Sequence, residues 1–212
     1  ERLRELVLLL LIFVVLLFFS TVIEYYLNAR LFNRVSTSVA IMGVLAIGQT
    51  LVVLTRNIDL SVGSMVGFTA YFVGQQLSQN NEITPLVAIF MAIGVGALMG
   101  GFNGFLVAFC RIPAIIVTLG TMALYRTLLV EYSNAKTVLT VNLPQWLLDL
   151  PRFNVLSYER LHLRLMVAGM LVVVILFQLS LRYTSFGRKL YAVGSNPEAA
   201  RNSGFSNRKI IF

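Results

Sequence analysis

Residues 6–23 read LVLLLLIFVVLLFFSTVI, an apolar run without a charged side chain. A helix needs roughly 20 such residues to cross a hydrocarbon layer of roughly 30 Å, so this run predicts a membrane protein. The run is longer than the apolar core of a signal peptide, and no small-residue cleavage motif follows it. Tyr25 and Tyr26 stand where an interfacial aromatic belt is expected. We therefore expect residues 6–23 to be a retained first span.

The rest of the chain repeats this pattern. Hydrophobic residues make up 58% of the sequence and charged residues 12%, against roughly 25% charged in a typical soluble domain. Six apolar stretches are separated by polar connections, at residues 6–23, 35–55, 60–81, 83–110, 112–125 and 165–181. We expect an all-α polytopic helical bundle, with residues 1–212 forming a single transmembrane domain that is truncated at its C-terminus.

The basic residues favour one orientation. Six spans place the chain start on the same side as residues 182–209, where Lys and Arg cluster at Arg182, Arg188, Lys189, Arg201, Arg208 and Lys209. Cytoplasmic loops carry this excess, so that side is predicted to be cytoplasmic. Against this orientation, the opposite side would also hold six basic residues, Arg30, Arg34, Lys136, Arg152, Arg160 and Arg164. The net charge of +8 is explained by the basic residues that flank the membrane spans. It gives no reason to expect a nucleic-acid partner.

Small residues recur in the fourth apolar stretch. Gly96, Gly100 and Gly104 are spaced every four residues, which places them on one helix face where a neighbouring helix can approach closely. We interpret this face as a packing surface, with a direct role toward a solute as the alternative. The spacing does not fit a dinucleotide-binding fingerprint, and no strand precedes it.

The connection at residues 55–64, TRNIDLSVGS, is unusually polar. Asp59 is placed to cap a helix beginning at Leu60, with Arg56 near enough to pair with it. One interpretation is a capped interfacial turn. The other is a broken-helix region beside a translocation pathway, where irregular backbone is tolerated only inside protein or facing water.

Neutral polar groups inside the spans extend the pathway hypothesis. They suit an uncharged polyhydroxylated solute better than an ion, although each could instead bond to a neighbouring helix. No intramembrane Asp, Glu or Lys relay is visible, which disfavours a proton-driven carrier or ion pump. The candidate pathway residues are Gln49, Asn57, Asp59, Ser61, Ser64, Asn103, Thr118 and Thr121.

Residues 194–205, GSNPEAARNSGF, predict a short polar helix after the last span. Asn196 can cap it, Pro197 suits its first position, Glu198 faces the positive end of its dipole, and Gly204 can close it in a left-handed conformation. Two turns are too short to be stable in water alone. The helix is therefore predicted either to dock on a partner or to be an ordinary loop helix. The small apolar docking surface would come from Ala199, Ala200 and Phe205.

Three motifs now carry a resemblance that covers nearly all of the chain: NIDLSVGS at 57–64, IPAIIVTLGT at 112–121, and FGR at 186–188 followed by GSNPEAAR at 194–201. In this order they resemble the membrane permeases of bacterial monosaccharide ABC importers, which include the ribose, xylose, rhamnose and autoinducer-2 systems of the branched-chain-amino-acid/ribose permease superfamily. The lead-in Thr55-Arg56-Asn57 replaces a more usual glycine-rich sequence and is similar to the rhamnose and autoinducer-2 branch.

The resemblance implies a type II-like importer fold and a multi-pass location in the bacterial inner membrane. It implies a second permease subunit, identical or different, a periplasmic or lipid-anchored sugar-binding protein, and a cytoplasmic ATPase. That ATPase would bind ATP and magnesium, and it would dock on a coupling helix within residues 194–205. The coupling residues would be Asn196, Pro197, Glu198, Ala199, Ala200, Arg201 and Gly204.

The chain itself shows no catalytic or cofactor motif. It lacks the glycine-rich lysine loop that binds nucleotide phosphates, and its sole histidine, His162, and sole cysteine, Cys110, do not make a metal site. We expect a permease subunit for a monosaccharide or sugar-like signal, driven by a separate ATPase. The alternatives are a secondary carrier working alone and a membrane-anchored structural protein. Dependence of uptake on ATP separates the importer from the carrier.

Overall fold

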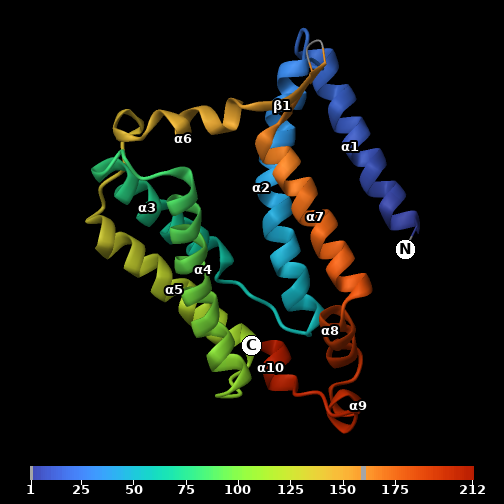
Figure 1. Ribbon diagram of the computed structural model, residues 1–212. Helices are drawn as coiled ribbons and strands as arrows, with labels where there is room; N and C mark the ends of the chain where they lie inside the picture. The colour runs from blue at the N-terminus through green and yellow to red at the C-terminus, as the bar shows by residue number, and fades with distance from the viewer. Residues whose placement is uncertain (1, 159–160) are drawn as a thin grey trace.

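The computed structural model describes residues 2–158 and 161–212, and most of this chain is helical. Figure 1 shows the long helices running up and down between two ends of the molecule. The helices are α1 Arg2–Val22, α2 Ala29–Leu54, α3 Val62–Gln79, α4 Pro85–Ala108, α5 Ala114–Ser133, α6 Gln145–Asp149, α7 Leu165–Tyr183, α8 Ser185–Ser195, α9 Pro197–Asn202 and α10 Asn207–Ile211. Short 3-10 turns occupy Thr140–Asn142 and Leu150–Arg152.

Five described helices are long and apolar enough to cross a membrane. These five lie within α1, α2, α4, α5 and α7. They confirm the prediction of an all-α polytopic membrane protein. The sequence predicted six such helices, and among the described residues there are five. The exception is α3, which is 18 residues long. Gln75, Gln76 and Gln79 make its final turns polar. These amides explain why α3 lacks the apolar character of its neighbours.

The long helices form two groups (Figure 1). In one group α2 packs against α7, and in the other α3 packs against both α4 and α5, which also contact each other. Residues 55–61 cross from the end of α2 nearest α8 to the start of α3 in the other group. The short helix α6 lies across one end of the molecule, and α8, α9 and α10 lie at the other. In α1 no side chain of the apolar window Glu5–Val22 is buried. This helix therefore presents its whole described apolar surface outward.

Local sequence signals account for the helix ends. Asn28 caps α2 by accepting a hydrogen bond from the Leu31 amide at 2.8 Å. Pro85 occupies the first turn of α4, where its missing amide hydrogen has no intrahelical partner to lose. Asn134 closes α5 in the left-handed conformation, with φ 48°. Asparagine adopts that conformation more readily than most residues.

The connection from α5 to α7 contains a hairpin that the sequence analysis did not predict. Strands β1 Asn154–Tyr158 and β2 Leu161–Arg164 pair antiparallel. The hairpin is fastened to α2, because the His162 amide donates to Asn33 at 3.3 Å and the Arg164 guanidinium donates to Thr37 at 2.9 Å. Arg160, which the sequence assigned to the outer side, lies outside the described residues.

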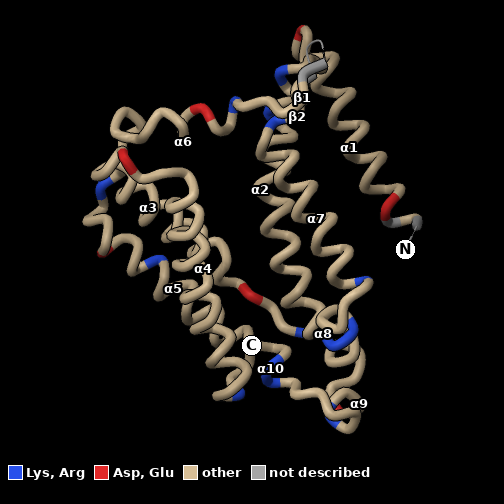
Figure 2. The backbone as a smooth tube through the Cα atoms, in the orientation of Figure 1, with Lys and Arg blue, Asp and Glu red and all other residues tan. Residues whose placement is uncertain are grey.

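Charges gather toward the ends of the bundle (Figure 2). The predicted basic cluster from Arg182 to Lys209 lies on the end of α7 and on α8, α9 and α10. The turn between α3 and α4 lies at the opposite end of the bundle (Figure 1). This arrangement agrees with the predicted alternation of the chain across a membrane, while the assignment of the basic end to the cytoplasm stays a prediction.

Candidate functional site

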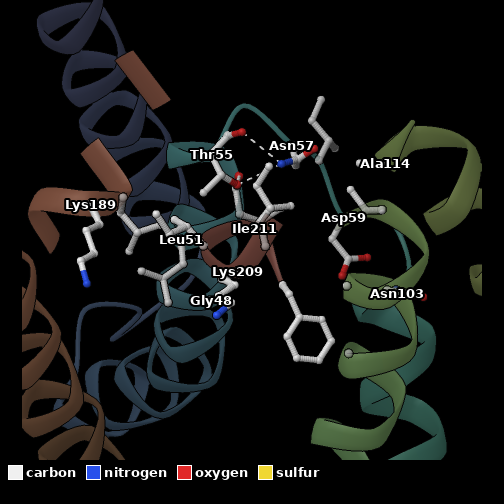
Figure 3. Close-up of a pocket in the computed structure, with 18 of the residues that line it drawn as sticks. Gly48, Leu51, Thr55, Asn57, Asp59, Asn103, Ala114, Lys189, Lys209 and Ile211 are labelled. Carbon is white, nitrogen blue, oxygen red and sulfur yellow. Dashed lines mark hydrogen bonds between the residues drawn. The ribbon is translucent and has the colours of Figure 1, made fainter. Parts of the chain in front are cut away.

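A cavity of about 720 Å³ lies between the two helix groups. Its walls come from α2, the 55–61 segment, α4, α5, α8 and α10, and Figure 3 shows the side chains that line it. The apolar part includes Leu51, Val52, Val107 and Ile211. The polar part includes Asn57, Asp59, Asn103 and Thr118. An apolar cavity with a few polar groups is the usual form of a small-molecule site.

The polar wall is built around Asp59. Its Oδ1 accepts hydrogen bonds from the Ser61 amide at 2.8 Å and from the Ser61 hydroxyl at 2.6 Å. The Asn103 side-chain amide donates to the Ser61 hydroxyl oxygen at 2.8 Å. Ser61 and Asn103 are buried, whereas Asp59 is half-buried and lines the cavity. Within the described chain no hydrogen bond reaches Asp59 Oδ2, so this oxygen remains available to a solute.

Tyr125 completes this network, and the sequence analysis did not identify it. The side chain is buried, and its hydroxyl lies 2.9 Å from the Met99 carbonyl oxygen and 3.2 Å from Asn103 Oδ1. A buried tyrosine hydroxyl needs such partners. The available signal was a tyrosine at the end of an apolar run, which is equally typical of an interfacial position.

The main chain beside Asp59 is fixed from two sides. Gln49 on α2 donates to the Asp59 carbonyl oxygen at 2.8 Å, and Thr118 on α5 donates to the Ile58 carbonyl oxygen at 3.3 Å. Asn57 donates to the Thr55 carbonyl and hydroxyl oxygens, both at 3.0 Å. Two backbone acceptors of the non-helical segment, at Ile58 and Asp59, are therefore satisfied by side chains of long helices, as a polar break within apolar surroundings requires.

The structure brings most of the predicted pathway residues together. Four of the eight, Gln49, Ser61, Ser64 and Thr121, do not line the cavity. Gln49 and Ser61 instead hydrogen-bond to Asp59, which does line it. Ser64 is half-buried on α3, and Thr121 is buried with its hydroxyl 3.4 Å from the Thr118 carbonyl oxygen. The expected cap also differs in detail, because Asp59 bonds to Ser61 and the helix begins at Val62, two residues later than the predicted start at Leu60.

The predicted pair between Arg56 and Asp59 is wrong. Arg56 instead donates from Nε to the Gly194 carbonyl and from a terminal nitrogen to the Ser195 carbonyl, at the end of α8. These carbonyls lie at the negative end of the α8 dipole, where a guanidinium is favourable. Asp59 bonds to Ser61 and lines the cavity. The Arg56 guanidinium and the Asp59 carboxylate therefore bind different groups.

The backbone at Arg56 is also unusual. It has φ 62°, the left-handed position after a helix that glycine usually occupies. The Arg56 amide donates to the Val53 carbonyl and the Asn57 amide to the Val52 carbonyl, the paired bonds of a Schellman helix end. A side chain in this conformation costs about 1–2 kcal/mol. The arginine is thus held in strained backbone where its side chain reaches α8.

The ends of α2 and α8 approach each other closely. A Cβ atom added to Gly194 would overlap the Leu54 carbonyl oxygen. Real Cβ atoms do not approach backbone oxygen so closely, so only glycine permits this contact. The Arg56 bonds and the Gly194 contact together join the end of α8 to the start of the cavity-lining segment.

The short helix α9 has the predicted local geometry. Asn196 Oδ1 accepts from the Glu198 amide at 3.0 Å and the Ala199 amide at 3.1 Å, Pro197 is in the first turn, and Gly204 has φ 85°. The predicted docking surface needs correction, because Ala200 is buried within the chain. The other predicted coupling residues remain reachable, because Pro197 is half-buried and the rest are exposed: Asn196, Glu198, Ala199, Arg201 and Gly204. Their contact with an ATPase stays a prediction.

The glycine face of α4 has a close neighbour within the described chain at only one of its three positions. A Cβ atom on Gly96 or Gly100 would meet no atom of the described chain within 4 Å. Gly100 and Gly104 instead line the cavity, and a Cβ on Gly104 would lie 3.2 Å from the Phe212 carbonyl oxygen. The close approach is therefore to Phe212, the residue after α10, at Gly104 only. Packing of this face against another helix or subunit stays a prediction.

Comparison with known proteins now identifies the family. Residues 31–212 match the model described as the permease component of the branched-chain amino acid transport system. The chain belongs to this permease family. Membership confirms the resemblance drawn from the three sequence motifs, and it agrees with a multi-pass protein of the bacterial inner membrane with five strongly apolar helices.

Several curated relatives are autoinducer 2 import system permease proteins LsrC. The protein from Enterobacter sp. (strain 638) is 40% identical over 181 residues, covering 84% of this chain and 50% of the relative. The protein from Escherichia coli O157:H7 is 35% identical over 212 residues, covering 99% of this chain and 58% of the relative. The chain therefore spans about half to three-fifths of these relatives. No solved structure gives a significant match.

Proposed function

We propose that this permease chain forms part of the translocation pathway of an ATP-driven importer for a monosaccharide or sugar-like signal, with the rhamnose or autoinducer-2 type favoured. The observation that carries this proposal is the cavity of about 720 Å³ between the two helix groups, with Asp59, Asn103 and Thr118 in its wall. Small-molecule sites commonly fall between roughly 300 and 1,000 Å³. A monosaccharide fits this range.

The chemistry of the cavity suits a polar solute. Asn57, Asn103 and Thr118 offer uncharged hydrogen-bonding groups, and Asp59 keeps one carboxylate oxygen without a described donor. Lys189 and Lys209 add two cationic groups to the lining (Figure 3). A solute rich in hydroxyl groups can donate to this oxygen and bond to the amides. The LsrC relatives are named for import of autoinducer 2, which supports a small polar signal molecule as the solute.

The partners follow from the same proposal. A second permease subunit, identical or different, would complete the pathway. A periplasmic or lipid-anchored binding protein would deliver the solute, and a separate cytoplasmic ATPase would bind ATP and magnesium. We propose that this ATPase contacts the exposed face of α9 at Glu198, Ala199 and Arg201. The chain itself would carry out no chemical step.

Reconstitution tests the proposal. The complete permease would be placed in proteoliposomes with its ATPase and binding protein, and uptake of radiolabelled autoinducer 2 and of rhamnose would be measured with and without enclosed ATP. ATP-dependent uptake of one solute is expected. Uptake at the same rate without ATP or ATPase would favour the secondary carrier, and no uptake of either solute would overturn the solute assignment.

A further inference from the structure

The contact between Arg56 and α8 joins two elements that the proposed function uses separately. Arg56 begins the non-helical stretch that runs through Asn57 to Asp59 in the cavity wall. Its two acceptors, the carbonyls of Gly194 and Ser195, belong to the last turn of α8. The next residue, Asn196, caps α9. One side chain therefore connects the cavity wall to the residues immediately before the predicted ATPase-docking helix.

The geometry of this connection suits the transfer of movement. A guanidinium donates from two nitrogens in a fixed planar fork, so bonding to two successive carbonyls fixes its orientation as well as its distance. On the cavity side, Gln49 and Thr118 hold the carbonyls of Asp59 and Ile58. A displacement of the α8 end would therefore reach this segment within three residues of chain.

The left-handed backbone of Arg56 indicates that the arginine side chain has a role there that glycine could not fill. Glycine fits the left-handed conformation of a Schellman helix end without strain. A second arginine provides a comparison, since Arg111 also has a left-handed backbone, with φ 59°, near the end of α4. Among the described residues Arg111 has no side-chain hydrogen bond, whereas Arg56 has two.

We propose that Arg56 is a positioning residue that ties the cavity-lining segment to the end of α8, so that movement of α9 repositions the segment. This inference rests on the proposed importer function. Arg56 is exposed, and hydrogen bonds at exposed charged groups contribute little to stability. Loss of the arginine should therefore change the coupling between ATP hydrolysis and the cavity, with little change in the stability of the fold.

The variant Arg56→Gly isolates this link. Glycine keeps the helix end and removes the backbone strain, but it breaks both bonds to α8. Arg111→Gly is the matched control, because it removes an arginine and relieves the same strain without breaking a link to α8. Arg56→Lys keeps a positive charge that can reach one carbonyl at a time, and partial rescue is expected.

The experiment uses the complete permease with its ATPase and binding protein, with Cys110 replaced by Ser and a single cysteine at Ile58. Ile58 lines the cavity and is 47% exposed. Labelling by a water-soluble maleimide is measured with and without ATP and vanadate, together with ATP hydrolysed per autoinducer 2 imported. We expect the nucleotide-dependent change in labelling to be lost in Arg56→Gly, with more ATP hydrolysed per molecule imported.

The outcomes separate the two proposals. A wild-type complex that shows neither ATP-driven uptake nor a labelling response would overturn the importer function and this inference with it. A responsive wild type with an equal response in Arg56→Gly would overturn only the role of Arg56. Failure of Arg56→Gly to assemble, while Arg111→Gly assembles, would make Arg56 a structural residue and would also overturn the inference.

Discussion

Replacing Asp59 tests whether the polar wall of the cavity contacts a solute or only shapes the chain. In Asp59→Ala both bonds from Ser61 are lost, and the buried Ser61 amide loses its acceptor. Hydrogen bonds to a charged group contribute about 1.5–3 kcal/mol each. Because Asp59 is half-buried, we expect a total loss of about 2–3 kcal/mol.

Asp59→Asn is the matched control. Its amide oxygen can still accept from both Ser61 donors, so we expect a smaller loss, about 1 kcal/mol. The second position changes from a carboxylate oxygen to an amide donor. If a solute hydroxyl donates to Oδ2, the asparagine variant should lose that charge-assisted bond, and uptake should fall about 10- to 100-fold.

The assay is uptake per assembled complex, with radiolabelled autoinducer 2 in proteoliposomes and the amount of complex measured by co-purification of the ATPase. Thermal unfolding in detergent reports stability separately. A pathway role predicts low uptake per complex in both variants. Wild-type uptake per complex in Asp59→Asn would refute the use of the carboxylate by the solute, and would leave Asp59 as the residue that orders the start of α3.

Three further changes test other parts of the structure. Glu198→Lys reverses an exposed charge in the first turn of α9, so co-purification of the ATPase should fall while membrane insertion is unchanged; full recovery would count against docking at this residue. Gly100→Leu adds a side chain where none is within 4 Å, so uptake should fall with an unchanged melting temperature; a lower melting temperature would indicate that this face packs against a neighbour. In protein with Cys110 replaced, a cysteine at Asn80 should react from outside the cell and one at Ser195 only after permeabilisation; labelling of both from outside would contradict the orientation.

The sequence was sufficient for the features that depend on local chemistry. Long apolar runs predicted the membrane helices, and Asn196, Pro197 and Gly204 predicted the geometry of α9, because caps and turns are decided by neighbouring residues. The partner of Arg56 could not be predicted in this way. Its acceptors lie 138 and 139 residues away, and pairing with Asp59 was the reasonable local choice.

The four-residue spacing of glycines in α4 likewise could not predict what lies against that face of the helix. The spacing of Gly96, Gly100 and Gly104 predicts a smooth surface, and the same surface can pack against a helix or border a cavity. Tyr125 illustrates the converse difficulty, because a tyrosine near the end of an apolar run is normally interfacial. Only the fold places its hydroxyl beside Met99 and Asn103, in the buried polar network.

The polar character of α3 has a consequence for how the protein is made. The other long helices are long and apolar enough to cross a membrane, so each is expected to partition from the translocon into lipid by itself. In contrast, α3 ends in glutamines and packs on α4 and α5, which are synthesised after it. Its stable insertion therefore depends on helices that leave the ribosome later. We expect α3 to remain in contact with the translocon until α5 has been synthesised.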